Sequence, residues 1–270
     1  MRLLRSLFAW TAFAIATAVC GTLALFVAWI PPRGHLMWPF ARIWSKTFLW
    51  TGGIRIKTEG PEVPGDRPFV YVSNHESLLD IPAIFFALPR PARFLAKKIL
   101  FYIPWVGWNM WLAGFIPVDR ANRKRAARAI DAAARRMQTG APILVFAEET
   151  RSPEGTLLPF QRGGFLLAMK ARLPIVPVGI DGTRRLLKKG GFILTPGTVT
   201  VRWGEPIETA SLHHRDRDEL IRRVRAEVQR LRGGGEIVPK DVATDPGKEE
   251  LRLFKSGEEN DSPASTLPSG

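Results

Sequence analysis

The segment YVSNHESLLD, residues 71–80, places His75 five residues before Asp80, where an apolar run gives way to polar residues. An imidazole with one ring nitrogen bonded to a carboxylate keeps its other nitrogen free as a general base near neutral pH. On a continuous helix, residues five apart point about 140° away from each other, so only a turn brings these side chains together. The residue types therefore permit acid–base catalysis if His75 lies in a turn.

The surrounding residues indicate where that turn lies. The apolar run 69–73 is typical of a strand, and Pro82 is best tolerated in the first turn of a helix, so Asp80 is expected in that turn. Ser77 and Asp80 also have the Ser-x-x-Asp spacing of a helix cap, in which His75 would be an ordinary turn residue. This segment alone leaves both capping and catalysis open.

Short β-rich runs alternate with helical stretches after residue 53 and must position this turn. The runs are IRIKTEG, PFVYVSN, ARFLAKK, GFIPVDR, PILVFAE, LPIVPVGI and TVTVRWG. Continuous apolar strands separated by helices predict an α/β fold with a mixed, largely parallel β-sheet flanked by helices. In the helical stretch 121–138, the residues expected on the buried face are Ala127, Ile130, Ala134 and Met137.

The N-terminal apolar segments are predicted to form membrane-associated helices. Residues 7–30 carry no charge and are long enough to cross a hydrocarbon layer of about 30 Å. Residues 35–53, interrupted by two basic residues, are typical of an interfacial helix. A cleaved signal peptide is the alternative for the first segment, and spanning the membrane or dipping into one leaflet as a hairpin is left open. The aromatic stretch 101–111 is expected either to form the floor of an acyl-chain groove or to lie at the membrane interface.

The whole chain divides into three expected parts. These are a membrane segment with an interfacial helix (1–52), a catalytic domain (53–232) and a disordered tail (233–270) rich in Gly, Pro, Ser and acids. The net charge of +14 suits an anionic partner, but the arginine-rich stretch 121–138 lacks aromatic residues for base stacking, so no nucleic acid is expected. The single cysteine excludes an intrachain disulfide, and no metal or cofactor motif is present.

Three later blocks decide between capping and catalysis. NHESLLD has the His-x4-Asp form that opens the glycerolipid acyltransferase family. GFIPVDR (114–120), FAEETRS (146–152) and LPIVPVGI (173–180) resemble its next three blocks in order and approximate spacing. The resemblance extends over residues 36–232 and is strongest to the bacterial 1-acylglycerol-3-phosphate acyltransferases.

This resemblance implies a reaction. His75, oriented by Asp80, would take the proton from the sn-2 hydroxyl of lysophosphatidate, and the oxygen would attack the thioester of acyl-CoA or acyl-carrier protein without a covalent acyl-enzyme. The product would be phosphatidate for phospholipid biosynthesis. Glycerol-3-phosphate, a lyso-ornithine lipid or another lysophospholipid are alternative acceptors. A non-catalytic lipid-binding protein that kept the fold is the alternative from another class.

The resemblance also implies a binding site and a location. The expected substrate-binding residues are Arg120, Glu148, Thr150, Arg151 and Lys97. The arginines would hold the phosphate, Glu148 would orient an arginine or the glycerol hydroxyl, and Lys98 is the alternative to Lys97. Membrane phospholipids are expected partners, and the expected location is the bacterial inner membrane with the active site at its cytoplasmic face.

The third block departs from the family pattern. Ala147 stands in place of a proline and Glu149 in place of a glycine. Glycine permits a positive φ or close approach of the backbone to phosphate, whereas glutamate restricts the first and adds a negative charge. We therefore expect either that Glu149 points away from the phosphate or that the acceptor head group differs from a simple phosphate.

Overall fold

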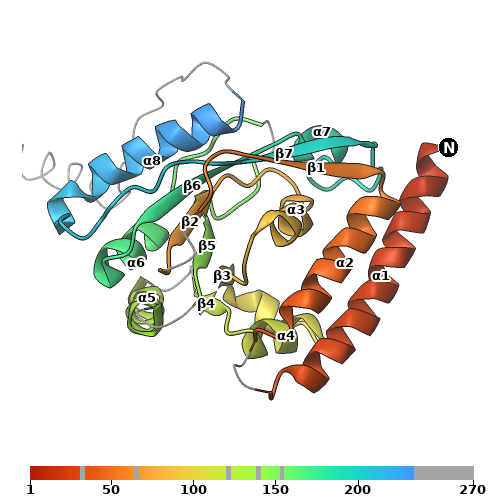
Figure 1. Cartoon of the computed structure of the whole chain (residues 1–270), viewed down its shortest axis with the longest axis horizontal. Helices are drawn as coiled ribbons and strands as arrows, with labels where there is room; N and C mark the ends of the chain where they lie inside the picture. The colour runs from red at the N-terminus through yellow and green to blue at the C-terminus, as the bar shows by residue number, and fades with distance from the viewer. Residues whose placement is uncertain (31–33, 64–66, 120–122, 138–140, 153–154, 234–270) are drawn as a thin grey trace, which may run out of the picture. The chain divides into compact units, whose positions relative to one another are not determined.

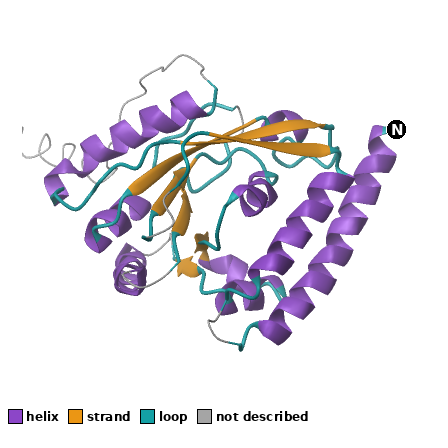
Figure 2. Ribbon diagram, viewed as in Figure 1, coloured by secondary structure: helices purple, strands orange, loops and turns teal. Residues whose placement is uncertain are grey.

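Helices cover both faces of a seven-stranded sheet (Figure 1). The computed structural model describes residues 1–30, 34–63, 67–119, 123–137, 141–152 and 155–233. The strands, orange in Figure 2, are β1 (Ile54–Glu59), β2 (Val70–Ser73), β3 (Arg93–Lys97), β4 (Ile116–Val118), β5 (Ile143–Phe146), β6 (Ile175–Asp181) and β7 (Gly197–Trp203). The α-helices are α1 (Arg2–Val27), α2 (Trp38–Thr51), α3 (Asp80–Ala87), α4 (Val106–Leu112), α5 (Arg123–Met137), α6 (Gly163–Ala171), α7 (Thr183–Leu186) and α8 (Arg217–Leu231). Two 3-10 helices are η1 (Lys98–Tyr102) and η2 (His214–Asp216).

The sheet is mixed and largely parallel, as predicted. Its strand order is β1-β7-β6-β2-β5-β3-β4, and β6 and β7 form the antiparallel pair among the described strands. Each of the seven β-rich runs contains one strand. The prediction of an α/β fold with helices on the sheet is therefore confirmed.

The central strands β2, β5 and β6 are almost continuously apolar because both of their faces are buried. Along β2, Tyr71 packs into a cluster with residues of α2 and α3, whereas Val70 and Val72 pack into a second cluster with residues of α5, α6 and α8. Figure 1 shows these two groups of helices on opposite sides of the sheet. A strand covered on both faces needs an apolar residue at each position, which removes the alternation seen in half-exposed strands.

Helices α1 and α2 lie side by side as an antiparallel pair (Figure 1). Rings of Phe13 and Phe48 lie 4.3 Å apart between their centroids, and the Trp44 indole donates a hydrogen bond to the Thr17 hydroxyl at 2.9 Å. The buried residues of α1 are small: Ser6, Ala9, Ala16, Cys20 and Ala24. Its exposed apolar residues include Leu4, Phe8, Ile15, Val19, Leu23 and Phe26. By length and composition α1 can cross a membrane.

The first turns of α1 are also tied to a segment far away in the sequence. The Trp10 indole donates to the Phe192 carbonyl at 2.8 Å and stacks on the Phe192 ring. The backbone N–H of Leu194 donates to the Ser6 hydroxyl at 2.9 Å. Helix α1 is therefore packed against the chain that leads into β7 as well as against α2.

Helix α5 is rotated slightly from the predicted orientation. Ile130 and Ala134 are buried as expected, but Ala127 is exposed, and Ala133 is buried in its place. The prediction for Ala127 was wrong because neighbouring alanines give two nearly equivalent apolar faces. The side chain of Met137 and the tail from residue 234 onward lie outside the described residues, and the boundary at residue 52 remains a prediction.

Candidate active site

Three parallel strands bring the first and third sequence blocks to one edge of the sheet. Ser73, the last residue of β2, pairs with Phe146, the last residue of β5, and with Val178 of β6, which continues to Asp181. The Asn74 side chain continues the pairing: its amide donates to the Ile180 carbonyl at 2.9 Å, and its oxygen accepts from the Ile180 N–H at 2.8 Å. Carboxyl ends of parallel strands are the usual position of sites in such sheets.

His75 lies in the turn between β2 and α3, and Asp80 is the first residue of α3. His75 Nδ1 lies 2.8 Å from Asp80 Oδ2, which also accepts from the N–H groups of Glu76 at 2.7 Å and Ser77 at 2.8 Å. Asp80 is fully buried. The carboxylate thus closes the turn and orients the imidazole at the same time. Because a carboxylate only accepts, Nδ1 carries the hydrogen and Nε2 is left as the basic nitrogen.

The backbone of His75 is held by the third block. Its N–H donates to Glu148 Oε1 at 2.8 Å, and its carbonyl accepts from the Ser152 N–H at 3.0 Å. The imidazole stacks on Phe146 with ring centroids 4.2 Å apart. The side chain, both backbone groups and one ring face of His75 are therefore fixed.

Both carboxylate oxygens of Glu148 accept hydrogen bonds from backbone N–H groups. Its carboxylate is buried, and while Oε1 accepts from His75, Oε2 accepts from the Leu158 N–H at 2.8 Å. Burial raises the pKa of Glu148 to about 7, against the opposing effect of these two N–H groups. The geometry makes Glu148 a support for the catalytic turn, and a contact with substrate or with an arginine stays a prediction.

The imidazole of His75 lines a cavity of about 970 Å³. Much of the wall is apolar and comes from α1, α2, α3 and the segment from β3 to α4. Three of the expected substrate-binding residues, Lys97, Thr150 and Arg151, line the same cavity, whereas Lys98 does not. Arg120 lies outside the described residues. The structure thus brings His75 together with two cations in one largely apolar chamber.

Two groups of residues in the cavity wall were not predicted from the sequence. Arg93 of β3 lines the cavity but lies outside the four family blocks. Besides Phe13, the face of α1 toward the cavity has the smaller residues Thr17, Cys20, Gly21 and Ala24, whose spacing of three, one and three residues marks a single helix face. That stripe of small residues was visible in the sequence, but a purely membrane-spanning helix shows the same pattern where it packs on another helix.

Glu149 has a backbone conformation that favours glycine. Its φ is 56°, in the left-handed region that glycine adopts without cost. One carboxylate oxygen lies 3.8 Å from the position that a Cβ would take on Gly163, in the first turn of α6. The side chain thus reaches toward the start of α6, but Glu149 also lines the cavity of His75, so both expectations for this residue stay predictions.

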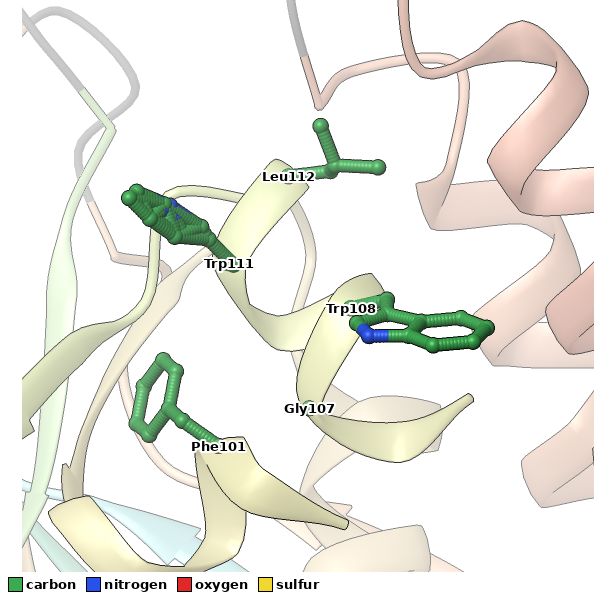
Figure 3. Close-up of a pocket in the computed structure, with 5 residues that line it drawn as sticks. All are labelled: Phe101, Gly107, Trp108, Trp111 and Leu112. Carbon is green, nitrogen blue, oxygen red and sulfur yellow. The ribbon is translucent and has the colours of Figure 1, made fainter. Parts of the chain in front are cut away.

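The aromatic stretch 101–111 lines two separate cavities, and its expected contact with an acyl chain or with the membrane interface stays a prediction. Trp105, Val106, Asn109 and Met110 line the large cavity. Figure 3 shows a separate hollow of about 280 Å³, lined by Phe101, Gly107, Trp108, Trp111 and Leu112. This hollow has no titratable lining residue, and both of its tryptophans are exposed. It therefore supplies apolar surface and no catalytic group.

Comparisons with known proteins agree with this geometry. A model of the family described as Acyltransferase matches residues 55–181. A 1-acyl-sn-glycerol-3-phosphate acyltransferase of Cocos nucifera is 34% identical over 184 residues, which cover 64% of this chain and 59% of that protein. The protein of the same name from Saccharomyces cerevisiae is 32% identical over 221 residues, which cover 79% of this chain and 73% of its own length.

A solved structure extends the likeness to nearly the whole chain. The crystal structure of the 1-acyl-sn-glycerophosphate (LPA) acyltransferase PlsC from Thermotoga maritima matches with a TM-score of 0.72 and 28% identity. The match covers 93% of this chain and 96% of that one. The chain therefore belongs to the acyltransferase family whose members include these 1-acyl-sn-glycerol-3-phosphate acyltransferases.

Proposed function

We propose that this protein transfers an acyl chain from acyl-CoA or acyl-carrier protein to the sn-2 hydroxyl of 1-acylglycerol-3-phosphate, forming phosphatidate. The single observation that carries the proposal is the 2.8 Å contact between His75 Nδ1 and Asp80 Oδ2 in the wall of a large apolar cavity. The family relationship supports the same substrate, because related proteins carry the name of this activity.

In the proposed reaction, His75 acts as a general base. Its Nε2 takes the proton of the sn-2 hydroxyl, and the oxygen attacks the thioester carbonyl carbon. The carbon–sulfur bond then breaks, and the proton on Nε2 passes to the departing sulfur, so one ester and one thiol are formed. Asp80 stabilises the imidazolium that exists between these two transfers, as the aspartate does in a Ser-His-Asp triad. The substrate hydroxyl takes the place of an enzyme nucleophile, so no covalent acyl-enzyme is required.

The cations in the cavity wall suit the phosphate of lysophosphatidate. Arg151 is planar and can make two parallel hydrogen bonds to phosphate oxygens, while Lys97 supplies a point charge from β3. Thr150 adds a hydroxyl from the loop that also carries Arg151. Arg120 is proposed as a further phosphate ligand on the basis of the family resemblance. Together these residues would hold the head group while the glycerol hydroxyl reaches His75.

The apolar part of the cavity suits an acyl chain. Its volume of about 970 Å³ is at the upper end of the range typical for small-molecule pockets. The wall from α1 and α2 includes Phe13, Trp38, Trp44 and Phe48. An alkyl chain placed there would lose its contact with water, which contributes about 0.8 kcal/mol for each buried methylene group.

The exposed apolar residues support attachment to a membrane. On α1 these include Phe8 and Phe26, and on the segment around α4 they include Trp105, Trp108 and Trp111. Tryptophan is enriched at the boundary between lipid and water. Because α1 packs along α2 and also lines the cavity, we favour a helical pair that enters one leaflet. We place the active site at the cytoplasmic face of a bacterial inner membrane, where the acyl donors are made.

The proposal is tested with detergent-solubilised full-length protein. A panel of lysophosphatidate, glycerol-3-phosphate, lyso-ornithine lipid and other lysophospholipids is offered with acyl-CoA or acyl-carrier protein, and thiol release and product mass are measured. We expect phosphatidate from lysophosphatidate and at least a 1,000-fold loss of kcat in His75→Ala, since both proton transfers lose their base.

A matched control is available in the same chain. His213 also lies beside an aspartate, Asp216, but is exposed and far from the cavity lining in sequence and element. His213→Ala should keep wild-type activity. Activity with another acceptor alone would overturn the assignment of lysophosphatidate as the substrate. If no thiol is released with any donor and acceptor, the enzyme assignment is overturned and a lipid-binding protein is the remaining alternative.

A further inference from the structure

Helix α8 lies on the face of the sheet opposite α1 and α2 (Figure 1), yet Arg232, the residue that follows α8, contacts the turn of His75. Arg232 Nη2 lies 2.7 Å from Glu76 Oε1. The side chains of Arg232 and Glu76 are 15% and 9% exposed, so this ion pair is largely shielded from solvent. Glu76 follows His75 directly, and the other contact of its Oε1 is a 3.1 Å hydrogen bond from the Asn74 amide. The pair therefore joins the end of α8 to both neighbours of His75.

Arg232 also holds the chain that follows the third block. The same guanidinium nitrogen donates to the Gly155 carbonyl, and Nη1 donates to Gln229 Oε1 at 3.3 Å. One heptad earlier on α8, Arg225 donates to the Leu157 carbonyl at 2.7 Å. Residues seven apart lie on the same face of a helix, so both arginines meet the segment that presents the Leu158 N–H to Glu148. Helix α8 is thus connected to His75 by two routes, one through Glu76 and one through Glu148.

The charges explain why an arginine is needed at this position. Glu76, Asp80 and Glu148 are all buried within one turn of His75 or in contact with it. Burial raises the pKa of Glu76, and the nearby Arg232 opposes this effect more strongly than the other neighbours do. A buried carboxylate that loses its cation is strongly destabilising, whereas removal of both partners costs much less.

We propose that Arg232 is a positioning residue for the acyl transfer: through the buried Glu76 carboxylate it fixes the turn of His75 and balances the charge beside the imidazole. The inference rests on the proposed function of His75 as the base. Arg232 is absent from the cavity lining, so it acts without touching substrate. Because Arg232 is the C-cap residue that directly follows α8, the end of that helix has a part in catalysis.

The first test is a double-mutant cycle on thiol release. Arg232→Met leaves the buried Glu76 carboxylate without its cation. We therefore expect kcat to fall at least about 10-fold while the KM for lysophosphatidate changes less than about twofold. Adding Glu76→Gln removes the stranded charge and keeps an oxygen that accepts from Asn74. The double variant should therefore recover most of the lost kcat.

The second test is the pH dependence of kcat/KM, which a purely structural contact would leave unchanged. The charged groups around the imidazole come from its own turn, from β3, from the loop after β5, from the end of β6 and from α8: Glu76, Asp80, Arg93, Lys97, Glu148, Glu149, Arg151, Asp181, Arg225 and Arg232. In Glu76→Gln the positive charge of Arg232 is no longer balanced, so the imidazole is protonated less readily. The acid limb of the profile, where kcat/KM falls as His75 is protonated, should therefore move about half a pH unit lower. Removal of both charges should return the limb to its wild-type position.

The matched control lies on the same helix. Arg230 pairs with Glu227 at 2.6 Å, but its side chain is 68% exposed, so Arg230→Met should leave kcat and the acid limb unchanged. Because Glu76→Gln keeps the hydrogen bonds of the turn, its pH profile remains measurable even where Arg232→Met does not accumulate.

The outcomes separate this inference from the proposed function. Inactive wild-type protein overturns the proposed function. If the wild-type protein is active, either of two results overturns the inference alone. One is a double variant that is no more active than Arg232→Met. The other is a Glu76→Gln variant whose acid limb lies at the wild-type pH.

Discussion

At the scale of single residues, His75, the proposed base, is held by carboxyl groups whose burial opposes their ionisation. Glu148 is the clearest case, because its carboxylate is buried and accepts two backbone N–H groups, one of them from His75. These hydrogen bonds favour the charged form, but burial outweighs them and raises the pKa to about 7. Ionised Glu148 therefore lowers the free energy of unfolding while its carboxylate holds the turn of His75.

This cost predicts a pH-dependent difference between wild type and Glu148→Gln. The raised pKa means that folded Glu148 binds a proton between about pH 4.5 and 7, where the unfolded chain has released it. The free energy of unfolding contributed by this group therefore falls as pH rises through that window, by about 3 kcal/mol at most. The glutamine variant lacks this titration, so it should gain thermal stability relative to wild type as pH rises from 5 to 8.

Thermal unfolding at several pH values measures this difference, and titrations shared by the two proteins cancel in it. The exposed Glu62 provides the control, since Glu62→Gln should follow wild type throughout. A stability difference between wild type and Glu148→Gln that does not vary with pH would contradict the assignment of the titration to Glu148.

The left-handed backbone at Glu149 gives a second prediction at this scale. The left-handed conformation of Glu149 costs a residue with a Cβ about 1 kcal/mol, whereas glycine adopts it without this cost. Glu149→Gly should therefore keep or raise the free energy of unfolding, by about 1 kcal/mol at most. Because the carboxylate lies toward the start of α6, the preference among lysolipid head groups should not change.

Denaturation and a panel of lysolipids measure the two effects separately. Arg172, which has a φ of 54° at the end of α6, is the control for strain alone. Arg172→Gly should give a similar stability change and wild-type kinetics. A shifted head-group preference in Glu149→Gly would mean that this glutamate contacts the acceptor after all.

At the scale of elements, α1 has two faces with different tasks. The exposed face is apolar and suits lipid, while the opposite face packs on α2 and lines the catalytic cavity. Small residues on the inner face leave space that larger side chains would fill. The helix that would attach the protein to the membrane is therefore also a wall of its active site.

This wall predicts a change in acyl-chain selectivity. Cys20 is buried and lines the cavity, so Cys20→Leu should shorten the space for the acyl chain and raise the ratio of kcat/KM for shorter over longer donors about 10-fold. Val19 is the adjacent residue on the exposed face, and Val19→Leu should leave the ratio unchanged. Competition between acyl-CoA donors of different length measures the ratio. An equal effect of both variants would argue against Cys20 as part of the chain-binding wall.

At the scale of the whole molecule, the apolar runs predicted the strands and the turn of His75, because these depend on patterns within a few residues. The mixed direction of the sheet was predicted from the alternation of strands and helices along the chain. The Glu148 contact with the His75 backbone was not predictable, since the same carboxylate type would suit an arginine or a hydroxyl equally well. The pairing of Glu76 with Arg232 joins residues far apart in the sequence, and arginine and glutamate are too frequent on helices for such a pair to stand out. The exposed Ala127 was missed because adjacent alanines do not define one face.

The contacts of α1 with Phe192 and Leu194 also impose an order in time. The Ser6 hydroxyl and the Leu194 N–H are separated by 188 residues, which a ribosome takes about 10 to 40 s to add. During that interval the nascent chain has α1 and α2 but lacks the segment that covers Trp10. The growing protein must therefore keep a long apolar helix in a helical pair or in lipid well before its catalytic cavity can close.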